Sequence, residues 1–399
     1  MNPIHVWPQE IQVADGFVTH SALIEDCEPF TLWFRVPAEH TGLLSSRAES
    51  FVAGVLLLAM MRGRPLRVHA PLSPSFLRNV EELQALWSCW DSGFHCIPIE
   101  AESESESTIQ APNRAISMFS GGVDSCYTVW RHTQNRCGRR ALPLQTALMV
   151  HGSEIPLDRD DMFETALRRS QIMLSAVNVD LVRLATNFRH VMPYDYIDKW
   201  FGTMLAASLL LFQESHTTGL IPASFSYHGL VLPYASTPLN DPLFSTARFA
   251  IEHDGAIGSR AEKMKDIIEW PGVLENLRVC NNSSYAHINC GRCEKCVRNI
   301  LTLRIVGVQA PPCFPNTLSN ADIEHIRIGH TSLEAMKRVV IAAQKASIQD
   351  SWVNSVQKCI RTNERRARWN PLRQKIKSHT PPPLWSAGKA LKNRLKKNS

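Results

Sequence analysis

The sequence predicts an α/β fold in which a twisted, parallel sheet is flanked by helices on both faces. Two observations lead to this prediction. Between residues 114 and 308, short apolar runs typical of buried strands alternate with longer segments of helical periodicity, and a glycine-rich loop joins the first run to the next helix. Because strand–helix–strand connections are right-handed, these strands should lie parallel and bind ligands beyond their carboxyl ends. The expected strands are residues 115–119, 146–150, 180–184 and 219–223, and the expected helices are residues 125–132, 160–177 and 200–213.

Regions of different composition on either side of this segment predict a three-domain chain. Residues 1–108 are expected to form a small α/β domain of unknown role, with strands at 31–36 and 66–70 and helices at 46–61 and 73–90. Its last part, residues 100–108, is acidic and has no apolar periodicity, so we expect a solvated linker there. Residues 109–308 form the main domain, and residues 309–399 form a helical region, helical from 321 to about 356, with a basic and partly disordered tail.

Composition bounds the location and the charge of the chain. The longest strongly apolar run, Phe51 to Met61, has 11 residues and is too short to cross a bilayer core of roughly 30 Å. The first residues contain no basic region followed by an apolar core, so we expect no secretory signal. A cytoplasmic location is therefore expected. Residues 361–399 contain 12 Lys or Arg and one acidic residue, which gives this segment a charge of +11. Because the net charge of the chain is +6, residues 1–360 carry a charge of −5. The body therefore has no general nucleic-acid signature.

The loop Ser120-Gly121-Gly122-Val123-Asp124-Ser125 is the strongest chemical signal in the chain. Adjacent glycines let the backbone approach an anion closely, and serine hydroxyls and free N–H groups at a helix start can cradle phosphate oxygens. Asp124 is a poor direct partner for phosphate, and we expect it to hold Mg²⁺ shared with a nucleotide. The loop is not followed by a lysine, which separates it from the Walker type. The alternative is a glycine-rich turn that only caps the helix.

Other polar residues are secondary candidates for the same site. Arg260 and Lys263 are expected on one side of a short helix, where they can neutralise pyrophosphate, and Glu262 can hold Mg²⁺ or orient a base. His151, at a strand end, is a candidate contact for adenine or ribose. Each residue also has a simpler interpretation: a solvated helix face for residues 260–263, and a capped loop histidine for His151.

Four cysteines within 17 residues form a second motif: Cys280, Cys290, Cys293 and Cys296. Four closely spaced thiolates suit a tetrahedral Zn²⁺ ion, and a site filled by four protein ligands is structural, because no position remains for a catalytic water. An iron–sulfur cluster also takes four cysteines and remains an alternative. With eleven cysteines and no expected secretory signal, reduced thiols are favoured over disulfides.

The loop and the cysteines together resemble a known enzyme superfamily. The sequence Ser120–Ser125 after an apolar strand is similar to the loop of the PP-loop ATP pyrophosphatases, which include amide synthetases and tRNA thiolation enzymes. Cys280 followed by the 290–296 cysteines, with Ser259–Lys263 upstream, resembles the 7-cyano-7-deazaguanine synthase (queuosine-precursor) branch over about residues 114–307. The resemblance implies an adenine-nucleotide alpha-hydrolase-like fold with ATP, Mg²⁺ and Zn²⁺. It also implies an ATP-dependent, AMP-forming carbon–nitrogen ligase that adenylylates a carboxylate.

Departures from that branch leave the substrate open. After the second strand the chain reads His151-Gly-Ser-Glu-Ile155 in place of the family's Tyr-Gly-Gln segment, and the family's Pro-Asp-Cys segment is not evident. The chain is also longer, and so resembles a divergent branch that includes proteins of bacterial anti-phage defence systems. The expected acceptor is the carboxylate of a small molecule or a protein terminus, and the expected donor is ammonia or an amine.

Two other functions remain open at this stage. One is a tRNA-modifying sulfur transferase that uses Cys126 as its nucleophile and the basic tail, with Trp385, as an RNA contact. The other is a nucleotide-binding subunit without catalysis, in which residues 1–108 and the tail dock protein partners. A disordered, solubilising tail is the simpler interpretation of residues 361–399.

Overall fold

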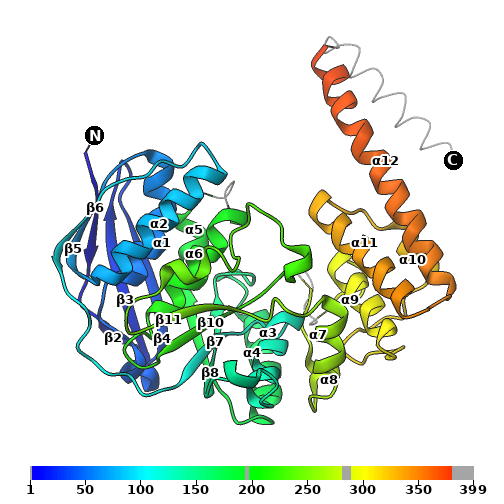
Figure 1. The fold of residues 1–399 in the computed structure, drawn as a ribbon, viewed down its shortest axis with the longest axis horizontal. Coiled ribbons are helices and arrows are strands. Elements are labelled where there is room, and N and C mark those ends of the chain that lie inside the picture. The colour runs from blue at the N-terminus through cyan, green and yellow to red at the C-terminus, as the bar shows by residue number, and fades with distance from the viewer. Residues whose placement is uncertain (1, 194–196, 281–288, 380–399) are drawn as a thin grey trace. The chain divides into compact units, whose positions relative to one another are not determined.

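The computed structural model describes residues 2–193, 197–280 and 289–379 (Figure 1). The strands are β1 (Ile4–Pro8), β2 (Gln12–Ala14), β3 (Phe17–Glu25), β4 (Phe30–Pro37), β5 (Leu66–Leu72), β6 (Ile99–Glu104), β7 (Ala115–Met118), β8 (Leu144–His151), β9 (Asp180–Thr186), β10 (Thr218–Pro222) and β11 (Ala250–Asp254). The helices are α1 (Glu49–Arg62), α2 (Pro74–Trp90), α3 (Val123–Thr133), α4 (Asp160–Ser175), α5 (Phe188–Val191), α6 (Ile197–Leu210), α7 (Arg260–Ile267), α8 (Val273–Asn276), α9 (Glu294–Ile305), α10 (Asn320–His325), α11 (His330–Lys345) and α12 (Ser351–His379). Short 3₁₀ turns include η1 (Ala38–Leu43), η2 (Gly138–Arg140), η4 (Tyr227–Gly229) and η5 (Asp241–Phe244).

The predicted α/β architecture is confirmed: in the described residues an 11-stranded, mostly parallel mixed sheet is flanked by helices. The strand order is β11-β10-β7-β8-β9-β4-β3-β1-β5-β6, and β2 pairs with β3. The five strands from β11 to β9 are parallel to one another. The predicted strands at 115–119, 146–150, 180–184 and 219–223 correspond to four of them. Parallel pairing with helices on both faces explains why β7 and β10 are buried, mostly apolar runs.

The strands before residue 108 belong to the same sheet as those after it. β4 pairs antiparallel with β9, in the register Phe34 to Thr186 and Arg35 to Ala185. The boundary expected at residue 108 therefore lies between segments that share one sheet. The sheet continues through antiparallel β3 and β1 to parallel β5 and β6.

The expectation of a linker is wrong for residues 100–104, which belong to strand β6. This strand pairs parallel with β5 at the end of the sheet. Ile99 and Ala101 are half-buried while the glutamates between and after them are exposed, so the segment alternates over a short distance only. Acidic side chains suit an edge strand because they discourage pairing with another chain. The composition that indicated a linker is therefore also that of a protected edge.

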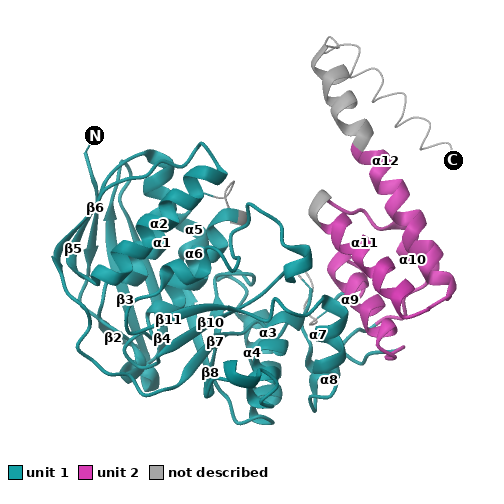
Figure 2. Ribbon diagram, viewed as in Figure 1, with its two compact units in different colours: residues 1–290, 310–315 teal, residues 291–309, 316–399 magenta. Residues whose placement is uncertain are grey.

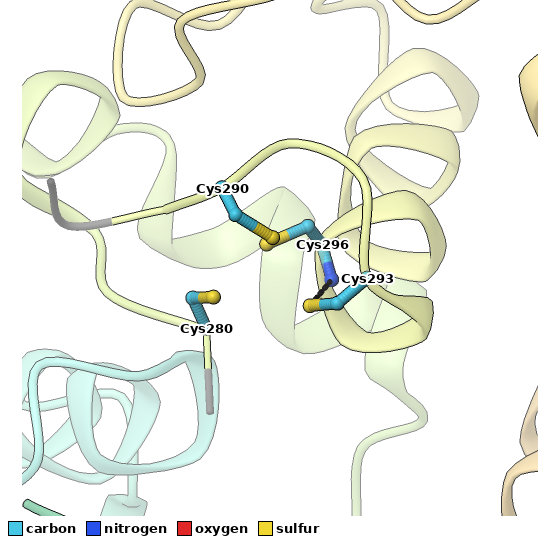
Figure 3. Close-up of side chains that lie close together, drawn as sticks. All are labelled: Cys280, Cys290, Cys293 and Cys296. Atoms are coloured by element: carbon cyan, nitrogen blue, oxygen red, sulfur yellow. Dashed lines mark hydrogen bonds between the residues drawn. The ribbon is translucent and has the colours of Figure 1, made fainter. Parts of the chain in front are cut away.

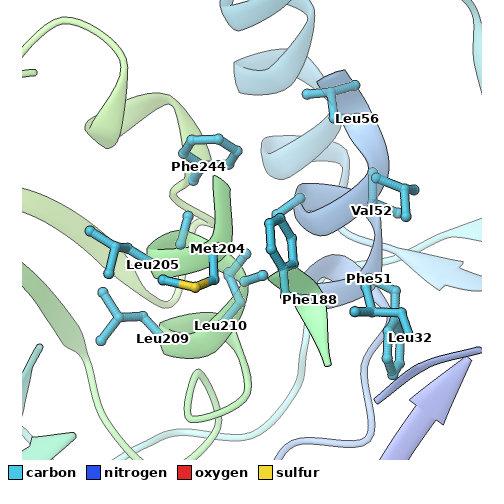
Figure 4. Close-up of a cluster of buried hydrophobic side chains, with 14 of the residues drawn as sticks. Leu32, Phe51, Val52, Leu56, Phe188, Met204, Leu205, Leu209, Leu210 and Phe244 are labelled. Atoms are coloured by element: carbon cyan, nitrogen blue, oxygen red, sulfur yellow. The ribbon is translucent and has the colours of Figure 1, made fainter. Parts of the chain in front are cut away.

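The apolar core contains α1 and α6, which pack against each other beside the sheet (Figure 4). Phe51, Val52 and Leu56 of α1 lie in one cluster with Phe188 of α5 and Met204 of α6. All residues of α1 from Glu49 to Met60 are buried, as expected of a helix that is apolar on every side. Residues 46–61 were predicted as a buried helix, and the structure agrees to within three residues at the start.

The chain divides into two compact units, residues 1–290 with 310–315 and residues 291–309 with 316–399 (Figure 2). The first unit contains the sheet and the helices α1 to α8. In the second, α9 packs on α11, and α12 packs on both α10 and α11. The predicted helical region is present, but α12 runs past 356 to His379, into the basic segment. Residues 380–399, the remainder of the predicted tail including Trp385, lie outside the described residues.

Across the part of the chain that is described, none of the helices combines the length and the apolar character needed to cross a bilayer.

Candidate functional site

The glycine-rich loop lies at the point where the winding of the parallel sheet reverses. β7 leads into the loop and α3 follows it, while β8 and β10 flank β7 on its two sides. From β7 the chain proceeds outward through β8 and β9, then returns to the other side for β10 and β11. In open α/β sheets such a reversal opens a crevice at the carboxyl ends of the strands, where ligands bind. The loop therefore occupies the position where a ligand is expected on topological grounds.

Hydrogen bonds within the loop fix its tight shape. The Ser125 hydroxyl donates to the Gly122 carbonyl at 3.1 Å and accepts from the Ser120 N–H at 3.2 Å. Gly121 has a φ of +72°, a left-handed conformation that side chains rarely adopt. The buried side chain of Val123 begins α3, whose first N–H groups have no acceptor within the helix. The predicted residues 120–125 thus form a tight turn at a helix start, which is a geometry that can accept an anion.

Two cations of α7 converge on the Asp124 carboxylate. Lys263 Nζ lies 2.9 Å from Asp124 Oδ1, and an Arg260 nitrogen lies 2.9 Å from Asp124 Oδ2. Lys263 also donates to the Ala223 carbonyl at 2.5 Å, just past the end of β10. The structure therefore brings Asp124, Arg260 and Lys263 together, on the β10 side of the loop.

The Lys263 ammonium is held in a low-dielectric environment. Its side chain is 2% exposed, and it lies 5.6 Å from the centre of the Tyr127 ring. Burial lowers the pKa of Lys263 below its usual value, and the Asp124 carboxylate opposes that shift by favouring the charged form. A buried ammonium paired with a carboxylate, beside a turn at a helix start, is electrostatically suited to a polyphosphate.

The capping of α7 determines how these cations are presented. Ser259 is the N-cap: its hydroxyl accepts the Glu262 N–H, while Glu262 Oε2 accepts the Ser259 N–H at 2.7 Å. This reciprocal pair fixes the first turn of the helix. Arg260 and Lys263 are three residues apart and therefore share a helix face. The geometry gives Glu262 a structural use, and its predicted role as a Mg²⁺ ligand or base remains a prediction.

His151 lies within the packing between β8 and α4. Its ring is 3% exposed and stacks on Phe163 at a centroid distance of 4.3 Å. The Nε2 atom is 2.9 Å from the Pro156 carbonyl oxygen, and burial lowers the pKa of the imidazole. These contacts match the capped loop histidine considered from the sequence, and contact with adenine or ribose remains a prediction.

Two residues that sequence reasoning missed lie on the β8 side of the loop. The Arg278 N–H donates to the Gly121 carbonyl at 2.8 Å, and its guanidinium donates twice to Glu154 Oε2, at 3.0 and 3.1 Å. Glu154 follows β8, so Arg278 connects the loops after β7 and β8. The only sequence signal was that Glu154 stands in the segment that departs from the family pattern.

Asp254, at the carboxyl end of β11, holds α3 in place through two hydrogen bonds. It accepts from the Thr128 hydroxyl at 2.8 Å and from Arg131 at 3.2 Å, both residues of α3. The carboxylate is buried, so these charged hydrogen bonds are needed to offset its desolvation. This contact holds the helix that begins with the loop against the end of the sheet.

The four predicted cysteines lie together (Figure 3). The sulfur atoms of Cys280, Cys290, Cys293 and Cys296 are all within 4.8 Å of one another, and the cluster could hold a metal ion. Cys293 is the N-cap of α9, and the Cys296 N–H points at its sulfur at 3.5 Å. For a tetrahedral ion with metal–sulfur bonds of about 2.3 Å, the sulfurs should be about 3.8 Å apart, which is within the 4.8 Å limit of this cluster.

Comparison of the chain with protein-family models, curated proteins and solved structures found no match.

Proposed function

We propose that the chain is an ATP-dependent, AMP-forming ligase that adenylylates a carboxylate and transfers ammonia or an amine to it. The observation that carries this proposal is the Ser120–Ser125 turn at the sheet's reversal point, with Lys263 and Arg260 paired to Asp124 beside it. The resemblance to the PP-loop ATP pyrophosphatases, in the 7-cyano-7-deazaguanine synthase-like branch, supplies the reaction type. The order of the five strands β11 to β9 is compatible with the implied adenine-nucleotide alpha-hydrolase-like fold.

The proposed reaction has two steps, adenylylation of the carboxylate and transfer of the acyl group to the amine. A carboxylate oxygen attacks the α-phosphorus of ATP and the bond to the bridging oxygen of the β-phosphate breaks, which releases pyrophosphate and leaves an acyl adenylate. The amine nitrogen then attacks the acyl carbon, AMP departs with the bonding electron pair, and the nitrogen loses a proton to give the amide. Stabilisation of the leaving pyrophosphate and the positioning of the two reactants supply most of the acceleration.

The residues of the loop and of α7 have distinct roles in this proposal. The amides of residues 121–123 and the hydroxyls of Ser120 and Ser125 bind the β- and γ-phosphates, and Lys263 and Arg260 neutralise them. Asp124 orients both cations, and carboxylate oxygens such as those of Asp124 are the type of ligand that Mg²⁺ prefers. Bound there, Mg²⁺ would neutralise charge on the departing pyrophosphate.

The cysteine cluster is proposed to hold a structural Zn²⁺ ion. Sulfur atoms within 4.8 Å of one another fit around a single ion. A four-iron cluster places its own iron and sulfide atoms between the cysteines and needs them further apart. Four protein ligands complete a tetrahedral shell, so the ion would stabilise the local fold and take no part in the chemistry.

The geometry of Cys126 weighs against the sulfur-transferase interpretation. Its side chain is fully buried on α3, and burial raises the pKa of the thiol far above its usual value. A sulfur carrier needs an accessible thiolate. The non-catalytic interpretation differs from ours in a single measurable respect, which is turnover of bound ATP.

The test is release of AMP and pyrophosphate by the full chain, with ATP, Mg²⁺ and a panel of small-molecule and peptide carboxylates. We expect carboxylate-dependent AMP formation and an acyl adenylate detectable by mass spectrometry. Gly122→Val and Asp124→Ala should abolish both. Gly42→Val is the matched control, because an added Cβ at Gly42 has no neighbour within 4 Å, whereas at Gly122 it meets the Arg278 carbonyl oxygen at 3.3 Å. If Gly122→Val or Asp124→Ala forms AMP at the wild-type rate, the proposal is wrong.

A further inference from the structure

Arg278 is a cation that contacts the Ser120–Ser125 loop from outside α7. Its N–H bonds to the Gly121 carbonyl, and its Cβ lies 3.6 Å from where a Cβ on Gly121 would be. Its carbonyl oxygen lies 3.3 Å from the corresponding position on Gly122. The arginine backbone therefore lies directly against the two glycines of the turn.

The segment that carries Arg278 is fixed on both sides by one buried side chain. The Asn289 amide nitrogen donates to the Leu277 carbonyl at 2.8 Å, and its oxygen accepts the Val279 N–H at 2.9 Å. Asn289 is completely buried, so these bonds are made in a low-dielectric environment where they are strong. Because both neighbours of Arg278 are held, the guanidinium can move only by rotation of its own side chain.

The contact that now holds the guanidinium is of a kind that can be exchanged. Both N–H donors of Arg278 point to one oxygen, Glu154 Oε2, instead of forming the parallel two-oxygen fork that makes arginine–carboxylate pairs strong. The Glu154 side chain is 36% exposed whereas that of Arg278 is 10% exposed, so the carboxylate can turn towards solvent but the guanidinium needs another anion in its place. A phosphate group offers several strongly charged oxygens to the same donors, and arginine binds phosphate in the fork geometry.

We propose that Arg278 is a phosphate-binding residue, which exchanges Glu154 for the polyphosphate of ATP on binding and returns to Glu154 when pyrophosphate leaves. Glu154 then acts as a placeholder that keeps the guanidinium ordered and in position between turnovers. Arg278 binds from the β8 side of the turn, opposite in the strand order to Lys263, which reaches the loop from the β10 side. This inference rests on the proposed function, because it takes the Ser120–Ser125 turn to be a pyrophosphate site.

The two partners should show opposite effects on the binding of inorganic pyrophosphate. Isothermal titration with Mg²⁺ present would be performed on the full chain and on the variants Arg278→Met, Arg278→Lys and Glu154→Gln. We expect Arg278→Met to weaken pyrophosphate binding by at least about ten-fold, with Arg278→Lys intermediate. Glu154→Gln should strengthen it by about two- to five-fold, since the competing carboxylate is removed. A purely structural pair would weaken binding in both variants.

Two controls separate this inference from the proposed function. Adenosine, which lacks phosphates, should bind Arg278→Met and wild type equally, and Arg140→Met, which removes an exposed arginine–glutamate pair before β8, should leave pyrophosphate binding unchanged. If wild type binds pyrophosphate and Arg278→Met binds it equally well, or if Glu154→Gln weakens it, the inference about Arg278 is overturned while the proposed function stands. If binding depends on Arg278 but no carboxylate yields AMP, the inference stands and adenylylation fails. If wild type does not bind pyrophosphate, both are overturned.

Discussion

The buried ion pair between α7 and the loop gives the sharpest quantitative prediction, for Lys263→Met. Unit charges 2.9 Å apart attract by about 6 kcal/mol at an effective dielectric constant of about 20, before desolvation is counted. Methionine keeps the apolar stem but removes the ammonium, so little volume is lost. Asp124 keeps Arg260 as a partner, while the Ala223 carbonyl loses the Lys263 donor. Because removal of one partner from a buried pair is costly and Asp124 stays paired, we expect a destabilisation of about 3 kcal/mol.

The assay is thermal unfolding of the full chain, with Lys265→Met as the matched control. For a unit of about 300 residues, 3 kcal/mol corresponds to a fall of about 5 °C in the unfolding midpoint. Lys265 lies on the same helix but is exposed, so its replacement should change stability by less than about 0.5 kcal/mol. A double-mutant cycle with Asp124→Asn should give a coupling of about 1–3 kcal/mol. If Lys263→Met behaves like Lys265→Met, or if the coupling is near zero, the buried-pair reasoning is refuted.

Three further predictions concern packing, pH and the cysteines. Gly202→Ala should destabilise the protein by more than about 3 kcal/mol or abolish folding, because the added Cβ on α6 would lie 1.8 Å from the buried Ala235 carbonyl oxygen. Soluble yield and the unfolding midpoint measure this effect. A midpoint equal to that of the wild type would contradict the prediction. Burial lowers the pKa of His216 to about 4, so its contribution is present above pH 6.5 and is lost as the pH falls towards 4. Urea unfolding should show His216→Gln losing about 2 kcal/mol less than wild type between pH 7 and pH 5, and parallel losses would count against this. Cys293→Ser should lower the zinc content of the purified chain from one ion towards zero and should lower the unfolding midpoint. Cys89→Ser, at an exposed cysteine, should change neither. Elemental analysis measures the metal content, and iron in place of zinc would overturn the choice of metal.

The sequence was informative where the local pattern and the tertiary environment agree. The strands at 115–118 and 218–222 are short, mostly apolar runs because they are buried in a parallel sheet, and their composition reflects that burial. The 120–125 loop could be located because a turn that cradles an anion needs glycine and hydroxyl residues in a fixed order. The four cysteines could be grouped because their spacing alone limits how far apart their sulfurs can be.

The remaining features depend on contacts between distant residues, which a single sequence does not reveal. Strand β6 was assigned to a linker because two half-buried positions are too few to establish a period of two. Arg278 is separated from Gly121 by more than 150 positions and belongs to no motif, so nothing local indicated that its backbone bonds to the loop. Glu262 was given a chemical role from its charge, whereas its place three residues after Ser259 fits the capping box that the structure forms.

The ladder between β4 and β9 has a consequence for how the chain can be divided. Residues 105–112, which follow β6, have no regular structure, so a protease is expected to cut there before it cuts the sheet. The two fragments would nevertheless co-purify, since β4 stays paired with β9 and α1 stays packed on α6. A chain that began after this segment would instead expose the backbone groups of β9 at Ala185 and Thr186, where β4 pairs with it, and unpaired strand edges associate with one another. The first hundred residues thus cover a sheet edge that could otherwise pair with another chain.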